Sequence, residues 1–247
     1  MWNAESIAIV TAVFLIAGLV KGIVGMGLPT VSLGLLALAF GPKEAIALML
    51  VPSLITNIWQ GVVGGNFMVL LKRLWSLLVM LCIGVWFGAG LLERGDAAYI
   101  SGGLGLILVV YAAISLMTPQ VGSPGHRETW LSPVMGGVNG ILTGLTGTFV
   151  IPGVPYLQAL GLDRMALVQA MGILFTTSTI ALAVSLSRHG LLPRDLGLLS
   201  AIALAPALAG MAGGQWVRHR ISETLFRTIL YWGLALLGVY LAARVFI

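Results

Sequence analysis

The sequence predicts an all-α fold, a polytopic membrane helix bundle of eight apolar segments (eight to ten helices). Of its 247 residues, 59% are hydrophobic and 9% are charged, with a mean hydropathy of +1.05, whereas a soluble domain carries about 25% charged residues. The charged side chains gather in short clusters that separate apolar runs of the length needed to cross a bilayer core of about 30 Å. Spanning segments without water to satisfy their backbone must be helical.

The apolar runs differ in length, and two of them are too long for one crossing. The first covers residues 6–40 and is broken only by Lys21, and the fifth covers residues 131–160. The N-terminus lacks the basic region and cleavage site of a signal peptide, so we expect the first run to remain as a membrane helix. The other uncharged runs include Ala45–Leu71, Leu74–Leu92, Met165–Ser187 and Leu196–Val217.

The chain reads as two homologous halves. At an offset of 118, GLVKGI lies over GGVNGI, so that Lys21 falls on Asn139. This duplication predicts three regions: a first membrane repeat over residues 1–118, an inter-repeat loop over 119–130 and a second membrane repeat over 131–247.

Each half starts with a glycine-rich interruption that ends in proline, at residues 18–29 and 136–152. Glycine weakens a helix and proline removes a hydrogen-bond donor, so the pattern predicts a broken helix at the start of each half. Close packing of helices on small residues is the alternative reading. If each overlong run forms a hairpin, the halves become inverted repeats, and the length of the runs favours this arrangement. The distribution of basic residues between the two sides is too even to decide the topology.

Paired breaks of this kind are typical of a transporter's binding site. An unwound backbone exposes N–H groups and a half-helix N-terminus, which favour an anion. The candidate substrate-binding residues lie at the two breaks or at matching polar positions of the following segments: Lys21, Gly22, Gly25, Gly27, Asn57, Gln60, Asn139, Gly144, Thr146, Gly147, Thr176 and Thr177.

The polar candidates each have a structural alternative. Lys21 is the only charge deep inside an apolar run, which makes it a functional candidate, unless helix one ends near it and the side chain reaches the interface. Asn57 and Gln60 can donate to an oxyanion without carrying charge, as can Thr176 and Thr177. Hydrogen bonding between helices is the alternative for all four.

The carboxylates all lie in loops or at segment ends, which argues against a cation pump. The pattern contains no nucleophile with a base, so no catalytic residue and no enzyme are expected, nor any metal or cofactor. The expected partners are a small anionic substrate and the lipid bilayer, with no nucleic acid. The oligomeric state stays open.

Four stretches carry a family resemblance: GLVKGIVGMGLP with VPSLITNIWQ in the first half, and GGVNGILTGLTGTFVIP with GILFTTST in the second. Over about residues 8–245 the chain resembles the sulfite exporter TauE/SafE family, also called the TSUP transporters. The resemblance implies a multi-pass transporter of the bacterial inner membrane, often for sulfur-containing anions. Some members have a lysine after the asparagine, where this chain has Asn57 followed by Ile58.

The sequence therefore predicts a secondary membrane transporter that exports a small anion such as sulfite or another sulfur-containing (organo)anion. A channel-like uniporter of a small solute is one alternative. A membrane assembly partner without transport activity is the other.

Overall fold

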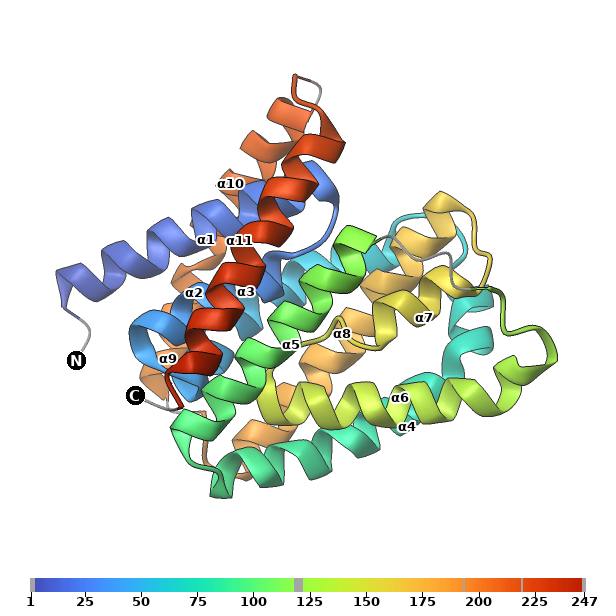
Figure 1. Cartoon of the computed structure of the whole chain (residues 1–247), viewed down its shortest axis with the longest axis horizontal. Helices are drawn as coiled ribbons and strands as arrows, with labels where there is room; N and C mark the ends of the chain where they lie inside the picture. Colours follow the sequence, from blue (N-terminus) through green and yellow to red (C-terminus); the bar gives the residue numbers. More distant parts are fainter. Residues whose placement is uncertain (1–2, 118–121, 193, 219, 246–247) are drawn as a thin grey trace. The chain divides into compact units, whose positions relative to one another are not determined.

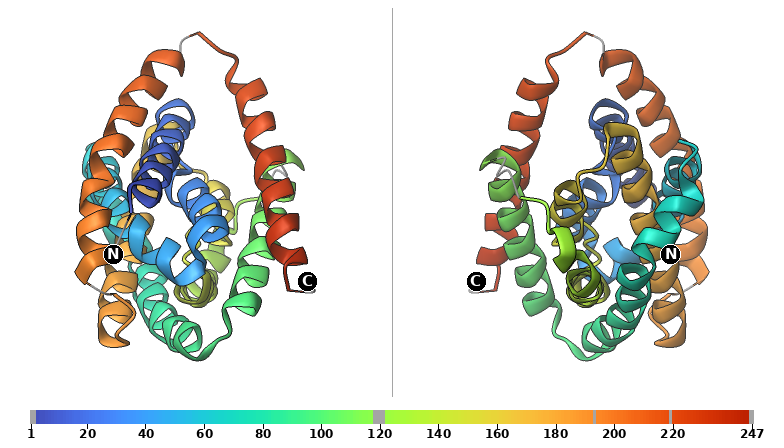
Figure 2. Two further views of the ribbon diagram at one scale, coloured as in Figure 1. Left: turned by 90° about the vertical axis from the view of Figure 1, so that its left-hand side faces the viewer. Right: turned by 90° about the vertical axis from the view of Figure 1, so that its right-hand side faces the viewer.

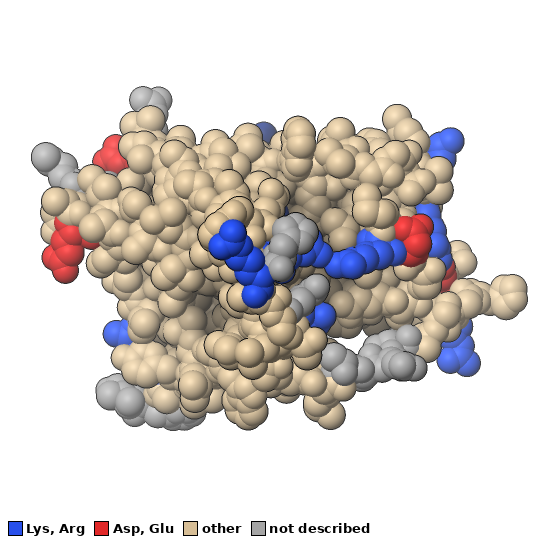
Figure 3. Space-filling view, turned by 90° about the horizontal axis from the view of Figure 1, so that it is seen from above, with Lys and Arg blue, Asp and Glu red and all other residues tan. Residues whose placement is uncertain are grey.

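The computed structural model describes residues 3–117, 122–192, 194–218 and 220–245, and these residues form helices joined by short loops, with no strand among them (Figure 1). Seven of the described helices are long and apolar enough to cross a membrane. On the face drawn in Figure 3, Lys, Arg, Asp and Glu occupy small clusters, and the other described residues on this face are uncharged. The chain is therefore a multi-pass α-helical membrane protein, as its sequence predicts.

The chain divides into two compact units, and each unit combines segments that are far apart in the sequence. The first contains the described residues of Met1–Pro52, Asp96–Thr118 and Leu192–Ile247, and the second those of Ser53–Gly95 and Pro119–Leu191. Both units draw on both predicted repeats, so packing units and repeats are different divisions of the chain. The duplication stays a prediction, and positions 118–121 at its centre lie outside the described residues.

The first unit is built on two helix pairs. In the first pair, a Cβ atom on Gly18 or Gly22 would clash with the backbone of Ala207 or Met211 respectively, so α1 and α10 touch closely and run parallel. The unit contains α1 (Ala4–Val24), α2 (Leu28–Phe40), the first part of α3 (Pro42–Val62), α5 (Ala97–Met117), α9 (Arg194–Ile202), α10 (Leu204–Arg218) and α11 (Glu223–Ala243).

The second pair of this unit joins α5 to α11, which lie side by side in Figure 2. Gly105 lies against the backbone of Gly238, and Gly102, earlier on α5, lies against Val245, which follows the end of α11. The two helices therefore run antiparallel.

The second unit repeats the close parallel crossing. Along α6, Gly136 lies against the backbone of Leu77 and Gly140 against that of Leu81, so α6 and α4 run in the same direction. The unit contains the second part of α3, α4 (Phe67–Arg94), the short 3-10 helix η1 (Gly125–Arg127), α6 (Glu128–Thr146), α7 (Gly153–Ala159) and α8 (Arg164–Arg188).

Two predicted segments have different bounds in the structure. The run Ala45–Leu71 does not form one segment, because α3 ends at Val62 and the chain turns at Gly64 and Gly65, whose φ angles are 137° and 82°. Helix α4 therefore begins before the Lys72–Arg73 pair, which lies inside the helix and not in a loop. The run Leu196–Val217 is interrupted at Ala203, between α9 and α10.

Candidate functional site

Both predicted breaks are present. α1 ends at Val24 and α2 begins at Leu28, while α6 ends at Thr146 and α7 begins at Gly153. The described backbone between them is non-helical, at residues 25–27 and 147–152. The prediction of a broken helix in each of the two overlong runs is confirmed.

The two breaks start with the same cap. Gly25 closes α1 with φ of 84° and donates its N–H to the Lys21 carbonyl at 2.8 Å, and Gly147 closes α6 with φ of 75° and donates to the Thr143 carbonyl at 2.7 Å. Gly27, which precedes α2, has φ of 101°. Residues with a Cβ atom rarely adopt this left-handed backbone conformation. The positive φ angles therefore explain why these three positions are glycine.

The second overlong run forms a hairpin. Asn139 of α6 accepts a hydrogen bond through Oδ1 from the Gly153 N–H at 2.9 Å, and the hydroxyls of Ser132 and Tyr156 lie 2.6 Å apart. The earlier residue of α6 pairs with the later residue of α7, so α7 folds back along α6. The hairpin geometry favoured by the length of this run is confirmed for residues 131–160.

The linker of the hairpin is bound to one face of α6. Thr143 donates its hydroxyl to the Thr148 carbonyl at 2.9 Å, and the hydroxyls of Thr146 and Thr148 lie 2.8 Å apart. Together with Ser132 and Asn139, Thr143 and Thr146 recur at helical spacing and form a buried polar face. The glycine face of α6 packs on α4, and its polar face contacts the linker and α7.

Asn139 holds the start of α7 and keeps one polar group unused. The residue is fully buried, and because the Gly153 N–H must meet an oxygen, the orientation of the Asn139 amide is determined. Within the described part of the chain, Nδ2 donates to no acceptor. Leu174 of α8 lies beside this contact, since a Cβ atom on Gly153 would lie 2.8 Å from both Leu174 Cδ2 and Asn139 Oδ1. A buried amide donor without an acceptor is unfavourable, so this position suits an acceptor supplied by a ligand.

The polar candidates on α3 and α8 differ in their hydrogen bonding. Gln60 donates through Nε2 to the Val168 carbonyl at 3.0 Å, which joins α3 to α8, and Thr177 donates to the Ile173 carbonyl of its own helix at 2.9 Å. Asn57 is fully buried on α3. The hydroxyl of Thr176 is buried and has no hydrogen-bond partner among the residues that the structure describes.

Two candidate glycines lie at helix crossings. A side chain on Gly22 would clash with the Met211 backbone of α10, and one on Gly144 would clash with the Val85 backbone of α4. Close helix packing, the alternative reading of the glycine pattern, accounts for glycine at these two positions.

The twelve candidates are divided between the two units. Lys21, Gly22, Gly25 and Gly27 lie in the first, and the other eight lie in the second. Lys21 is in the last turn of α1, so the helix does end close to it, and its side chain is only 5% exposed.

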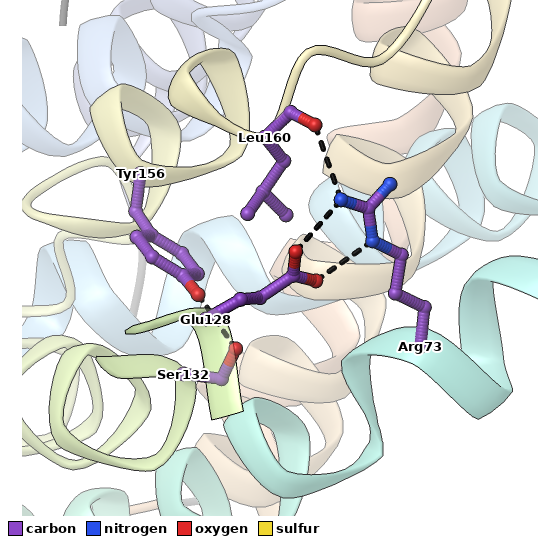
Figure 4. A network of polar contacts seen from close by, with 5 residues as sticks. All are labelled: Arg73, Glu128, Ser132, Tyr156 and Leu160. Atoms are coloured by element: carbon purple, nitrogen blue, oxygen red, sulfur yellow. Dashed lines mark hydrogen bonds and ion pairs between the residues drawn. The ribbon is translucent and has the colours of Figure 1, made fainter. Parts of the chain in front are cut away.

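An ion-pair network holds the open end of the α6–α7 hairpin (Figure 4). Arg73 of α4 contacts Glu128 with two bonds, Nε to Oε1 at 2.7 Å and Nη2 to Oε2 at 2.8 Å. Its Nη2 also donates to the Leu160 carbonyl, just after α7, at 3.1 Å. One guanidinium therefore joins the start of α4, the start of α6 and the end of α7.

The candidate set lacks several residues that shape this region. Thr143 and Thr148 bind the linker, and Gln169 of α8 holds the α3–α4 loop by donating to the Gly61 carbonyl and accepting from the Asn66 N–H, both at 3.0 Å. The helical spacing of Ser132, Asn139, Thr143 and Thr146 was a signal for the polar face, while no pattern in the sequence singles out Gln169. Among the described residues, no group of three His, Cys, Asp or Glu could hold a metal ion.

Comparison with known proteins gives one match. No curated protein and no solved structure matches this chain. The sequence model of the sulfite exporter TauE/SafE family matches residues 10–241, nearly the whole length of the chain. With this match and seven apolar membrane-length helices, the chain belongs to the sulfite exporter TauE/SafE family of membrane transporters.

Proposed function

We propose that this protein is a secondary transporter of the bacterial inner membrane that exports a small anion, sulfite or another sulfur-containing (organo)anion. The observation that carries the proposal is Asn139, a fully buried amide at the broken helix that keeps a free donor at Nδ2. The family match supports transport and leaves the choice of solute to this site.

The chemistry of the break suits weak and reversible anion binding. A neutral amide donor contacts an oxyanion without the strong attraction of a full charge, so the bound anion can leave again. Thr176, a buried hydroxyl of α8 in the same unit, is a second proposed donor. Lys21 of the first unit is proposed separately as part of a solute pathway, because a buried cation in a membrane helix marks such a pathway by default.

The proposed route is alternating access between inverted repeats. The α6–α7 hairpin returns the chain to the side where α6 starts, since Leu160 meets the same Arg73 that pairs with Glu128. If α1 and α2 form a corresponding hairpin, followed by single crossings of α3, α4 and α5, the first repeat has an odd number of crossings, which would place the second repeat upside down relative to the first. The antiparallel packing of α5 and α11, the last helices of the two repeats, supports this relation.

The direct test is a counterflow experiment with the full-length protein in proteoliposomes. Vesicles loaded with unlabelled sulfite should take up labelled sulfite transiently against its gradient, and taurine, sulfoacetate, sulfate and acetate in the interior would rank the preferred solute. A channel-like uniporter would give flux without counterflow. An assembly partner would give no flux with any anion, and that result would refute the proposal.

A further inference from the structure

The second unit contains a hollow of about 500 Å³ that none of the candidate substrate residues lines. It lies between the inter-repeat loop, α6 and α7. Its walls are apolar: Leu131 and Met135 come from α6, and Pro152, Pro155 and Ala159 come from the end of the linker and from α7. A volume of this size is typical of ligand sites, and walls of this kind exclude a small hydrated oxyanion.

One part of the lining is polar and positively charged, because Ser123 and Arg127 contribute to it. The side chain of Arg127 is exposed, and it forms no ion pair with any residue in the described ranges. The neighbouring carboxylate of Glu128 is already bound on both oxygens by Arg73. The positive charge of Arg127 is therefore available to an anionic group.

The hollow lies at the depth of a membrane interface. Its lining residues come from the charged inter-repeat loop and from the apolar run of residues 131–160 that follows it. Trp130, next to the wall residue Leu131, is 56% exposed, and exposed tryptophans at the ends of apolar segments typically lie among lipid headgroups. A molecule here would have its apolar part beside the acyl chains and its polar part beside Arg127.

We propose that this hollow binds an anionic phospholipid, with one acyl chain between α6 and α7 and the phosphate on Arg127. Apolar walls together with one basic lining residue complement this kind of molecule, and charge-assisted bonds from a guanidinium to a phosphate are strong. Burial of the chain supplies the remaining affinity. The site is separate from the proposed anion site, and its assignment does not depend on what the protein transports.

The bound lipid would brace the hairpin. Pro152 of the wall precedes Gly153, whose N–H is held by Asn139, and Tyr156 of the wall is bonded to Ser132. An acyl chain in the hollow would pack against Pro152, Pro155, Tyr156 and Ala159, next to these bonds. The lipid therefore stabilises the folded-back position of α7 against α6.

The test uses photoactivatable lipids with the full-length protein in nanodiscs. A phosphatidylglycerol and a phosphatidylcholine, each with a diazirine on an acyl chain, are crosslinked and the labelled peptides are identified. We expect phosphatidylglycerol to label residues 131–135 and 152–159 more than phosphatidylcholine does. Arg127→Gln should lower this phosphatidylglycerol labelling about fivefold, the effect of one basic residue near an anionic lipid.

Two further variants make the assignment specific. Met135→Trp fills the hollow and should remove labelling of these peptides by both lipids. Arg94→Gln removes an exposed basic residue at the far end of α4 and should label as the wild type does. Equal labelling by both lipids in the wild type, unchanged labelling in Met135→Trp, or an equal loss in Arg94→Gln would overturn the proposal. Arg127 is an exposed residue, so the test does not rest on a variant with a disturbed core.

Discussion

The Ser200 hydroxyl of α9 donates a hydrogen bond to the Leu48 carbonyl of α3 at 2.7 Å. In a regular helix this carbonyl would accept from the residue four positions later, but that residue is Pro52, which has no N–H. The same hydroxyl oxygen accepts from the Val51 N–H at 3.0 Å. Ser200 is thus inserted into the hydrogen-bond ladder of α3 at the point where proline interrupts it.

Removal of this insertion should destabilise the protein. Ser200→Ala removes the hydroxyl that donates to the buried Leu48 carbonyl, and should lower the free energy of unfolding by about 1–3 kcal/mol. The measurement is equilibrium unfolding in mixed detergent micelles. Adding Pro52→Ala restores an N–H to the helix, so the serine should matter less in that background. An equal loss in both backgrounds would contradict this explanation, and Ser187→Ala, at an exposed hydroxyl bonded within its own helix, is the control.

The α4–α6 crossing should tolerate no side chain on its glycine face. Gly140→Ala places a methyl group against the Leu81 backbone, which cannot move like a side chain, and should cost about 3 kcal/mol of stability. Gly137 lies on the same helix and a Cβ there would meet only the Met80 side chain, at 3.7 Å. Gly137→Ala should therefore be neutral, or stabilising by up to about 1 kcal/mol. Thermal unfolding of the two variants checks the difference, and similar midpoints would refute the crossing.

The α1–α10 crossing of the first unit predicts a similar contrast. Gly214→Ala should lower the unfolding temperature, because its Cβ would clash with the Leu19 backbone. Gly213→Ala should not, because a Cβ at Gly213 meets nothing within 4 Å. Helix propensity alone would make the two substitutions alike. A common effect would mean that packing does not set the requirement for glycine here.

The Arg73–Glu128 pair should depend on the shape of the guanidinium as well as its charge. Arg73→Lys keeps the charge but cannot form two parallel bonds to Glu128 and a third to the Leu160 carbonyl, so we expect a loss of about 1 kcal/mol. Glu128→Gln should cost a similar amount, and the double variant less than the sum of the two. A double-mutant cycle measured by unfolding gives this coupling. Additive losses would show that the pair contributes nothing jointly.

Asn139→Asp separates binding from structure. A carboxyl group still accepts from the Gly153 N–H, and the lost Nδ2 donors bond to nothing among the described residues, so the hairpin should be kept. The two N–H donors of Nδ2 are lost, so sulfite counterflow should fall at least about tenfold, the effect of one lost hydrogen bond to a charged group. Counterflow at the wild-type rate would remove Asn139 from the binding site. Loss of both flux and stability in this variant would point to a structural role alone.

The broken helices could be predicted because their causes are local. Gly25, Gly27 and Gly147 adopt positive φ angles, and glycine takes this conformation without a steric penalty. The residue type at these positions is therefore enough to predict the end of a helix. The roles of Gly22 and Gly144 could not be read in this way. Each lies against a helix from a distant part of the chain, and only the fold brings Met211 or Val85 to it. Gln60 could not be placed either, since its amide could reach a solute or the Val168 carbonyl and the sequence does not say which is nearer.

The sequence by itself determined that this chain is a multi-pass helical membrane protein with two helix breaks, because apolar length, charge spacing and glycine conformation act over a few neighbouring residues. The tertiary structure alone decided that α1 packs on α10 and α4 on α6, that α7 folds back to place Gly153 on Asn139, and that Ser200 completes the ladder of α3. The last two of these contacts join residues 14 and 152 positions apart, respectively. Such contacts depend on the shape complementarity of helix surfaces and on hydrogen bonding between buried polar groups. No pattern of neighbouring residues in the sequence encodes them.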